Sequence, residues 1–351
     1  MSCHFCIQII VSCLRVSCIF RQTYKQEKVT VKPHLIFSLK SYIFCLDWIR
    51  LIMLSRLFKS TSSSAASSSS SSTAPTNTSA SMSFNGFISV DYKSNPVDIP
   101  DTFLTGPASE PVTIRPVPFK ESGLPEYAKC KAWILDNVLS REECSELIAY
   151  AEASAPLEKP GDSPWKPALV SVAPGVEASA PNYRHSDRII WDTQLLVDRL
   201  WDRCAQAEGL QELVATAPCP RPYRDRSKKG TWKFAGLNER MRFLKYGPGM
   251  FFRRHCDGAY SSENPDGSIQ ETYYTLHLYL SDEGLVGGAT AFSSLDKKRR
   301  MDVDPKAGSV LIFQHQLLYH EGVEVIEGLK YTMRTEIMYR WEDEPKAEGE
   351  N

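Results

Sequence analysis

The chain has 351 residues, which is long enough for one large domain or two small ones with a sizeable core. Its 41 Lys and Arg residues balance 42 Asp and Glu residues, so charge gives no reason to expect a nucleic acid or membrane partner. Of the ten cysteines, five precede residue 46 and the others are scattered, which excludes a disulfide framework and favours a reducing compartment. A small molecule or a protein segment remains the expected substrate class.

Residues 1–81 predict no folded domain. Their apolar runs are interrupted by charged residues and fall short of the ~20 apolar residues of a membrane span, so we expect no stable membrane anchor. The serine-rich tract at 60–83 cannot bury a core and is expected to be disordered. The stretch from Met53 is basic and Ser-rich, as in organellar transit peptides. A cytoplasmic location is favoured, and a mitochondrial location is the alternative if translation starts at Met53. Residues 1–81 could also be absent from the mature protein.

The Pro- and Gly-rich segment 82–128 predicts an extended lead-in, and regular structure begins with a short strand at 132–135. Ser140 and Glu143 have the spacing of a capping box and predict that a helix starts there. A second amphipathic helix is expected within 193–206, and its predicted buried side consists of Leu195, Leu196, Leu200 and Trp201.

Beyond this helix the chain predicts strands. Four short runs are rich in β-branched or aromatic residues and bounded by turn formers: 240–247, 272–281, 308–313 and 330–341. Helices followed by strands predict a mostly β fold of the α+β class, in which the helices pack on an antiparallel sandwich or barrel. Residues 342–351 are expected to form a disordered tail.

Two His-x-Asp pairs could hold a metal. Residues two apart on a strand face the same side, so His255 and Asp257 could reach one ion, as in the two-histidine, one-carboxylate sites of non-heme iron oxygenases. The third ligand is predicted to be His320, which follows a strand that reads as buried. The rival pair, His185 and Asp187, lies between arginines ahead of a helix and is interpreted as loop or structural.

Two further histidines are alternatives to these ligands. His315 lies five residues before His320 and could replace it as a ligand. A role in orienting the ligands, without binding the metal itself, is favoured. His277 lies within a predicted strand and is interpreted as a packed or hydrogen-bonded core residue.

A basic residue follows His320 at a distance of ten positions. Lys330 opens the last predicted strand and could pair with the distal carboxylate of a dicarboxylate co-substrate. Arg334 is the alternative partner. It shares a strand face with Lys330 but lies roughly 13 Å away at ~3.3 Å per residue, so one carboxylate cannot easily reach both.

Residues 239–341 resemble the catalytic domain of the iron- and 2-oxoglutarate-dependent dioxygenases, in particular the prolyl 4-hydroxylase-like branch. The matching stretches come in order, "RFLKYGPGMFFRRHCDG", "LYLSDEGLVGGATAF" and "AGSVLIFQHQLLYHEGVEVIEGLK". The segment "AWILDNVLSREECSELI" extends the resemblance to about 129–341, the predicted domain. It implies a double-stranded β-helix, also called a jelly roll.

The resemblance also implies roles for single residues. His255, Asp257 and His320 would bind Fe(II), Lys330 would bind the C5 carboxylate of 2-oxoglutarate, and Tyr246 would line the co-substrate site. The implied enzyme hydroxylates a protein prolyl residue or a small metabolite with O2, releases succinate and CO2, and uses ascorbate as a reductant. The alternative is a catalytically inactive jelly-roll binding or scaffold protein. Neither reading predicts the oligomeric state.

Overall fold

The computed structural model describes residues 85–173, 175–218 and 230–344. The predictions for residues 1–81 lie outside this range, as does most of the tail predicted at 342–351. None of the described helices is long and apolar enough to cross a membrane.

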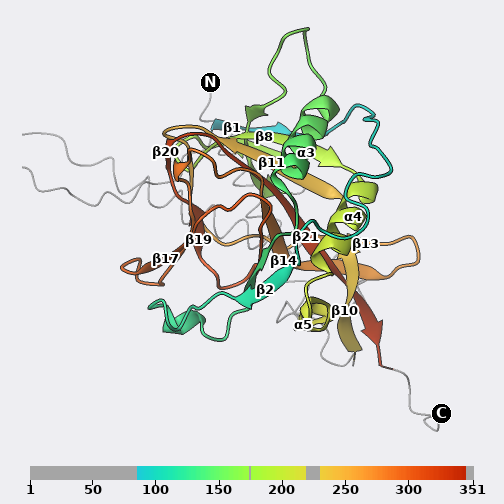
Figure 1. The fold of residues 1–351 in the computed structure, drawn as a ribbon, viewed down its shortest axis with the longest axis vertical. Helices are drawn as coiled ribbons and strands as arrows, with labels where there is room; N and C mark the ends of the chain where they lie inside the picture. The colour runs from blue at the N-terminus through green and yellow to red at the C-terminus, as the bar shows by residue number, and fades with distance from the viewer. Residues whose placement is uncertain (1–84, 174, 219–229, 345–351) are drawn as a thin grey trace, which may run out of the picture. The chain divides into compact units, whose positions relative to one another are not determined.

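The described part is mostly β, with two antiparallel sheets that form the predicted jelly roll (Figure 1). The larger sheet has eleven strands. Along its main path these are β2 (Thr113–Pro116), β3 (Ala132–Asp136), β18 (Val310–Gln314), β14 (Ile269–Tyr279), β21 (Lys330–Asp343), β11 (Arg240–Tyr246), β8 (Asp187–Asp192) and β4 (Lys166–Pro167). Beside this path lie β9 (Thr216–Ala217), β10 (Gly230–Leu237) and β13 (Ser261–Glu263).

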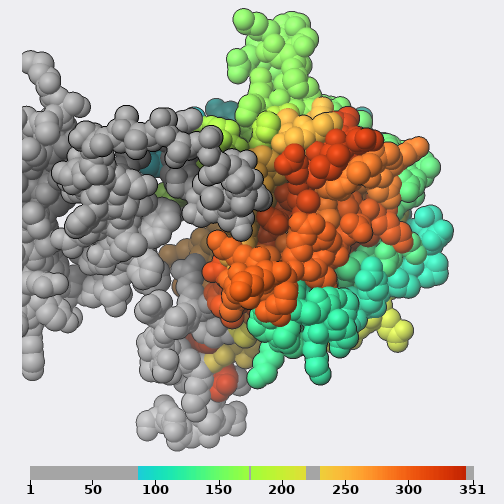
Figure 2. Space-filling model, turned by 90° about the vertical axis from the view of Figure 1, so that its left-hand side faces the viewer, coloured from blue at the N-terminus to red at the C-terminus, as the bar shows by residue number. Residues whose placement is uncertain are grey.

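The smaller sheet carries the strands on which the histidine motifs lie. Its order is β17 (Arg300–Val303), β16 (Thr290–Ser293), β19 (His320–Gly322), β12 (Phe251–His255) and β7 (Arg184–His185). Two minor sheets contain β1 (Asn85–Ser89), β6 (Val176–Ser179) and β5 (Val170–Ala173), and β15 (Val286–Gly287) with β20 (Val325–Glu327). In Figure 2 the described surface on the side of β17 and β19 is made mostly of C-terminal segments coloured orange to red.

The helices lie on the side of the large sheet away from β17 and β19 (Figure 1). They are α3 (Arg141–Ser154), α4 (Gln194–Cys204) and α5 (Leu210–Val214). Their apolar side chains share one buried cluster with residues of the large sheet. A short 3-10 helix, η1 (Pro125–Tyr127), lies apart from these helices, and its Tyr127 belongs to a second buried cluster that includes residues of β16 and β17. The main hydrophobic core therefore lies between helices and sheet, which leaves the opposite face of the sheet free to line a site.

The first helix begins where the capping box predicts. Ser140 accepts a hydrogen bond from the Glu143 backbone, and the Glu143 side chain accepts one from the Ser140 backbone, so two otherwise unpaired N–H groups are satisfied. The burial predicted for α4 is partly wrong. Leu195 is 50% exposed, whereas Val197 is fully buried. The buried side of the helix contains Leu196, Val197 and Leu200, and Leu195 lies outside it.

The last strand is longer than predicted. β21 continues to Asp343 because Asp343 and Glu342 pair with Gly230 and Thr231 of β10. The predicted tail boundary at residue 342 is therefore two residues too early, since a long-range strand partner extends a segment that looks like a charged terminus in sequence.

Gly308 is expected to tolerate no side chain. It has φ +79°, and an added Cβ would lie 1.9 Å from the carbonyl oxygen of Leu139. We expect Gly308→Ala to lower the free energy of unfolding by about 1–3 kcal/mol, through overcrowding and backbone strain. Gly267 has the same φ but nothing within 4 Å of its Cβ position, so Gly267→Ala is the control for strain alone. Equal losses for the two variants in thermal unfolding would refute the steric argument.

Candidate active site

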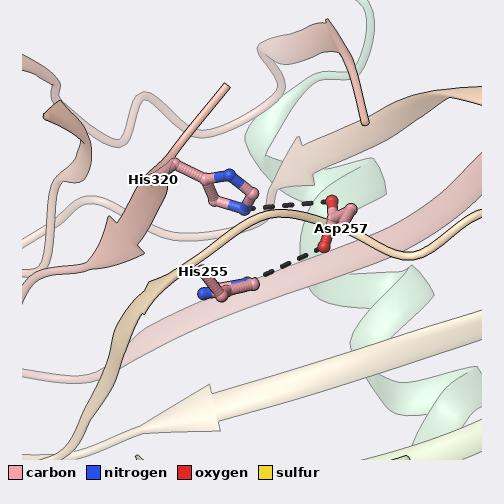
Figure 3. Close-up of side chains that lie close together, drawn as sticks. All are labelled: His255, Asp257 and His320. Carbon is pink, nitrogen blue, oxygen red and sulfur yellow. Dashed lines mark ion pairs between the residues drawn. The ribbon is translucent and has the colours of Figure 1, made fainter. Parts of the chain in front are cut away.

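Three side chains converge between the two sheets (Figure 3). His255 ends β12 and His320 begins the neighbouring β19, and the two residues are directly paired across these strands. Residues paired in this way have Cβ atoms only about 4.5–5.5 Å apart, so both rings reach the same point. Strand pairing thus joins two histidines that are 65 positions apart in the sequence.

Asp257 reaches the same point by a different route from the one predicted. It lies beyond the end of β12, so the alternation of a strand does not set its direction. Its carboxylate is held instead by the large sheet, where Thr275 donates a hydrogen bond to Oδ2 at 2.5 Å. The guanidinium of Arg334 lies 3.2 Å from Oδ1. The strand-face argument is therefore wrong for this residue, although the residue lies where it was expected.

The imidazoles present their Nε2 atoms to the carboxylate. Nε2 of His255 is 3.7 Å from Oδ1 of Asp257, and Nε2 of His320 is 3.8 Å from Oδ2. On the other side of each ring, Nδ1 contacts a backbone carbonyl oxygen, that of Arg253 at 2.7 Å and that of Leu318 at 3.1 Å. A carbonyl can only accept, so each Nδ1 donates its hydrogen and each Nε2 keeps a free lone pair.

The charges of these groups favour metal binding. Burial lowers the pKa of His255 to about 3 and also lowers the pKa of His320, so both rings are neutral at pH 7. Burial alone would raise the pKa of Asp257, but the guanidinium of Arg334 beside it holds that pKa well below its usual range. Two lone pairs and one carboxylate thus face each other within 4.8 Å. Three acceptors without a donor between them repel one another, and a bound cation would remove this repulsion.

Among the described residues, these three form the one group of His, Cys, Asp and Glu side chains with metal-binding spacing. Two imidazoles and one carboxylate are the donor set of non-heme Fe(II) oxygenases, so the residues present fit that ion. His315 is not part of the group. It is 1% exposed, and in the described part of the chain neither of its ring nitrogens has a hydrogen-bond partner.

A pocket surrounds the three ligand atoms. Its space amounts to about 520 Å³, including the part open to solvent. Besides the three converging residues, the lining includes the predicted co-substrate residues Tyr246, Lys330 and Arg334. His277, interpreted from sequence as a core residue, also lines this pocket, and its Nε2 has no hydrogen-bond partner within the described residues.

The two candidate basic groups differ in their partners. Arg334 contacts Asp257 at 3.2 Å and Glu336 at 3.3 Å, so its charge is already compensated. Lys330 is 2% exposed, and no ion pair reaches its ammonium group from the described residues. The nitrogen lies 5.3 Å from the ring centre of Tyr246, and burial lowers the pKa of Lys330 to about 7. The pocket therefore contains a buried basic group that no anionic side chain of the described residues pairs with.

The rival motif is structural, but it is not a loop. His185 belongs to β7 and Asp187 to β8, and β7 pairs with β12. Arg184, beside that motif, lines the pocket and lies 4.6 Å over the ring of Phe252. Sequence reasoning missed Arg184 because only the pairing of β7 with β12 brings it to the site.

Residues 241–337 match the family model of the 2OG-Fe(II) oxygenase superfamily. The chain carries a 2OG-Fe(II) oxygenase domain. For these residues the match confirms the predicted oxygenase superfamily and class of enzyme, and the superfamily implies Fe(II), 2-oxoglutarate and O2. No curated protein matches the chain.

Solved structures with partial similarity include three prolyl hydroxylases. A viral collagen prolyl hydroxylase from Paramecium Bursaria Chlorella virus-1 is 19% identical, with a TM-score of 0.35, over 59% of this chain and 95% of that one. A Pseudomonas putida prolyl-4-hydroxylase is 17% identical, with a TM-score of 0.38, over 63% and 99%. A Trichoplax adhaerens prolyl hydroxylase, solved with a hypoxia inducible factor peptide, is 13% identical, with a TM-score of 0.38, over 62% and 88%. Similarity at this level does not transfer substrate specificity.

Proposed function

We propose that the chain is an Fe(II)- and 2-oxoglutarate-dependent hydroxylase, with residues 129–341 as its catalytic domain. One observation carries the proposal. Two neutral imidazoles and a carboxylate converge in a pocket whose wall also contains a buried lysine with which no described acidic residue pairs. A scaffold protein has no use for either feature, because each leaves uncompensated polar groups inside the protein.

In this proposal His255, Asp257 and His320 hold the iron. Iron bound there would supply the activation of O2, so that one oxygen atom would be incorporated into the substrate and the other into succinate, with loss of CO2 from 2-oxoglutarate. The backbone carbonyls of Arg253 and Leu318 orient the two rings and fix their tautomers. Thr275 and Arg334 hold the carboxylate of Asp257. Ascorbate is proposed as the reductant that maintains the iron as Fe(II).

The contacts of the two basic residues favour Lys330 over Arg334 as the anchor of 2-oxoglutarate. Arg334 contacts a proposed iron ligand, so it lies at the metal end of the pocket. Lys330 is four residues away on the same face of β21, roughly 13 Å along the strand. A dicarboxylate bound to iron through its keto-acid end would extend its other carboxylate away from the iron. There Lys330 would bind that carboxylate, with Tyr246 beside it.

The affinity for 2-oxoglutarate is expected to depend on pH through Lys330. Burial lowers the pKa of this lysine to about 7, so above pH 7 binding of a carboxylate must also take up a proton. The Kd should therefore rise by about tenfold per pH unit above pH 7 and level off below it. Calorimetric titration of the Mn(II)-loaded protein across this range measures the slope. Lys330→Arg should flatten it, because arginine stays charged. The same slope in that variant would show that another group titrates.

The substrate is proposed to be a protein prolyl residue or a small metabolite, in the cytoplasm. The function is tested by incubating purified protein with Fe(II), 2-oxoglutarate and ascorbate, and measuring succinate with and without a cell extract. Mass spectrometry then identifies extract components that gain one oxygen atom. Succinate formation that depends on Fe(II) supports a dioxygenase. If no succinate forms and 2-oxoglutarate does not bind the metal-loaded protein, the chain is the inactive scaffold instead.

A further inference from the structure

Arg334 lies between two carboxylates. Its Nη1 is 3.2 Å from Oδ1 of Asp257, and its Nη2 is 3.3 Å from Oε1 of Glu336. Glu336 is 3% exposed and also contacts Arg242, whose Nη1 lies 2.8 and 2.9 Å from its two oxygens. Asn238 donates a further hydrogen bond to Glu336 at 3.2 Å. Positive and negative groups thus alternate from Arg242 to Asp257.

The sheet register fixes this chain of charges. Arg242 on β11 and His277 on β14 are the residues paired with Arg334 on either side of β21. Glu336 is two residues further along β21, on the same face as Arg334, and is paired with Thr275. Thr275 in turn donates to Asp257. Both groups that hold the Asp257 carboxylate therefore come from the middle of the large sheet, where strands on both sides limit movement.

The two arms of the guanidinium explain why an arginine is needed here. Its two terminal nitrogens contact different carboxylates, Nη1 that of Asp257 and Nη2 that of Glu336. A lysine has one nitrogen and cannot place separate nitrogens at both carboxylates. Arg334 is also a positive charge next to a proposed cation site, which by itself would weaken metal binding. Glu336 compensates that charge, so Arg334 can hold the Asp257 carboxylate with little loss of metal affinity.

We propose that Arg334 is a positioning residue for the metal ligand Asp257, and that Glu336 and Arg242 hold Arg334 in place. The inference rests on the proposed function, because it takes Asp257 to be a ligand. It assigns Arg334 a role distinct from co-substrate binding and gives roles to two residues, Glu336 and Arg242, that the metal and co-substrate motifs do not include.

The test separates metal affinity from co-substrate affinity. Arg334→Lys keeps the charge but removes the second arm, so it should weaken Mn(II) binding about 10- to 100-fold, as expected when a group that orients a ligand is lost. At saturating Mn(II), the affinity for 2-oxoglutarate should not change. Both constants are measured by calorimetry on the full chain. Arg240→Lys is the matched control, since Arg240 forms a two-armed pair with Asp192 and does not line the pocket.

Each outcome decides the inference. If Arg334→Lys weakens 2-oxoglutarate binding and leaves Mn(II) binding intact, Arg334 is the co-substrate anchor and the inference is wrong. Native Mn(II) affinity in this variant also overturns it. If the variant does not fold, Glu336→Gln replaces it, because this change keeps the side-chain shape and should also weaken Mn(II) binding. If the native protein binds no Mn(II), the proposed function itself fails.

Discussion

His320→Ala is expected to abolish metal binding while the protein remains folded. Nε2 of His320 is one of three converging ligand atoms, and the ring is oriented by a backbone carbonyl. Losing a ligand should cost more than the roughly 100-fold upper range for losing a group that only orients one. Calorimetry with Mn(II) and iron analysis of the purified protein measure the loss. Iron-dependent succinate formation should disappear with it.

His315→Ala is the control for this change. His315 is also a buried imidazole and lies five residues earlier, in the connection between β18 and β19. It is not among the converging ligands. Its removal should lower thermal stability and leave Mn(II) affinity close to native. Should His315→Ala lose the metal while His320→Ala keeps it, the third ligand is misassigned.

Lys330→Met is expected to weaken 2-oxoglutarate binding by about 3–5 kcal/mol, because the distal carboxylate would then be buried without a partner. This corresponds to roughly 10²- to 4 × 10³-fold in Kd. Mn(II) affinity should not change, since Lys330 contacts none of the three ligand side chains. Thermal stability should stay the same or increase, because a buried ammonium that pairs with no acidic residue in the described ranges becomes an apolar side chain.

Lys245→Met is the matched control on the neighbouring strand. The ammonium group of Lys245 lies 5.9 Å from the ring centre of Trp165 and 5.7 Å from that of Tyr331, outside the pocket. Its loss should leave 2-oxoglutarate binding unchanged. Equal effects of the two lysine variants would point to general electrostatic attraction, and native affinity in Lys330→Met would place the anchor elsewhere.

Local patterns predicted several elements well. The capping box of Ser140 and Glu143 predicted the start of α3, and short runs rich in β-branched or aromatic residues predicted β11, β14, β18 and β21. Such patterns are readable because they depend on residues close in sequence. Burial on α4 was predicted less well, because the direction of its buried stripe depends on where the sheet lies.

The sequence by itself determined the mostly β class, the oxygenase family and the set of residues that could bind a metal. The strand-forming runs indicated the class, and the resemblance of three ordered stretches indicated the family. Spacing indicated the candidate ligands, since the separations of His255 from Asp257 and of His320 from Lys330 are visible in the chain. It did not determine which basic residue is free to bind a carboxylate. That depends on Arg334 being paired with Asp257 and Glu336, while no described ion pair reaches Lys330.

Only the tertiary structure decided how Asp257 is held and how Arg184 enters the pocket. Thr275 and Arg334 come from the sheet opposite β12, and Arg184 arrives through the pairing of β7 with β12. These contacts join segments distant in sequence, and no local propensity encodes them. The pKa values of the site also depend on tertiary structure, because burial lowers the pKa of both histidines and Arg334 keeps the buried carboxyl of Asp257 ionised.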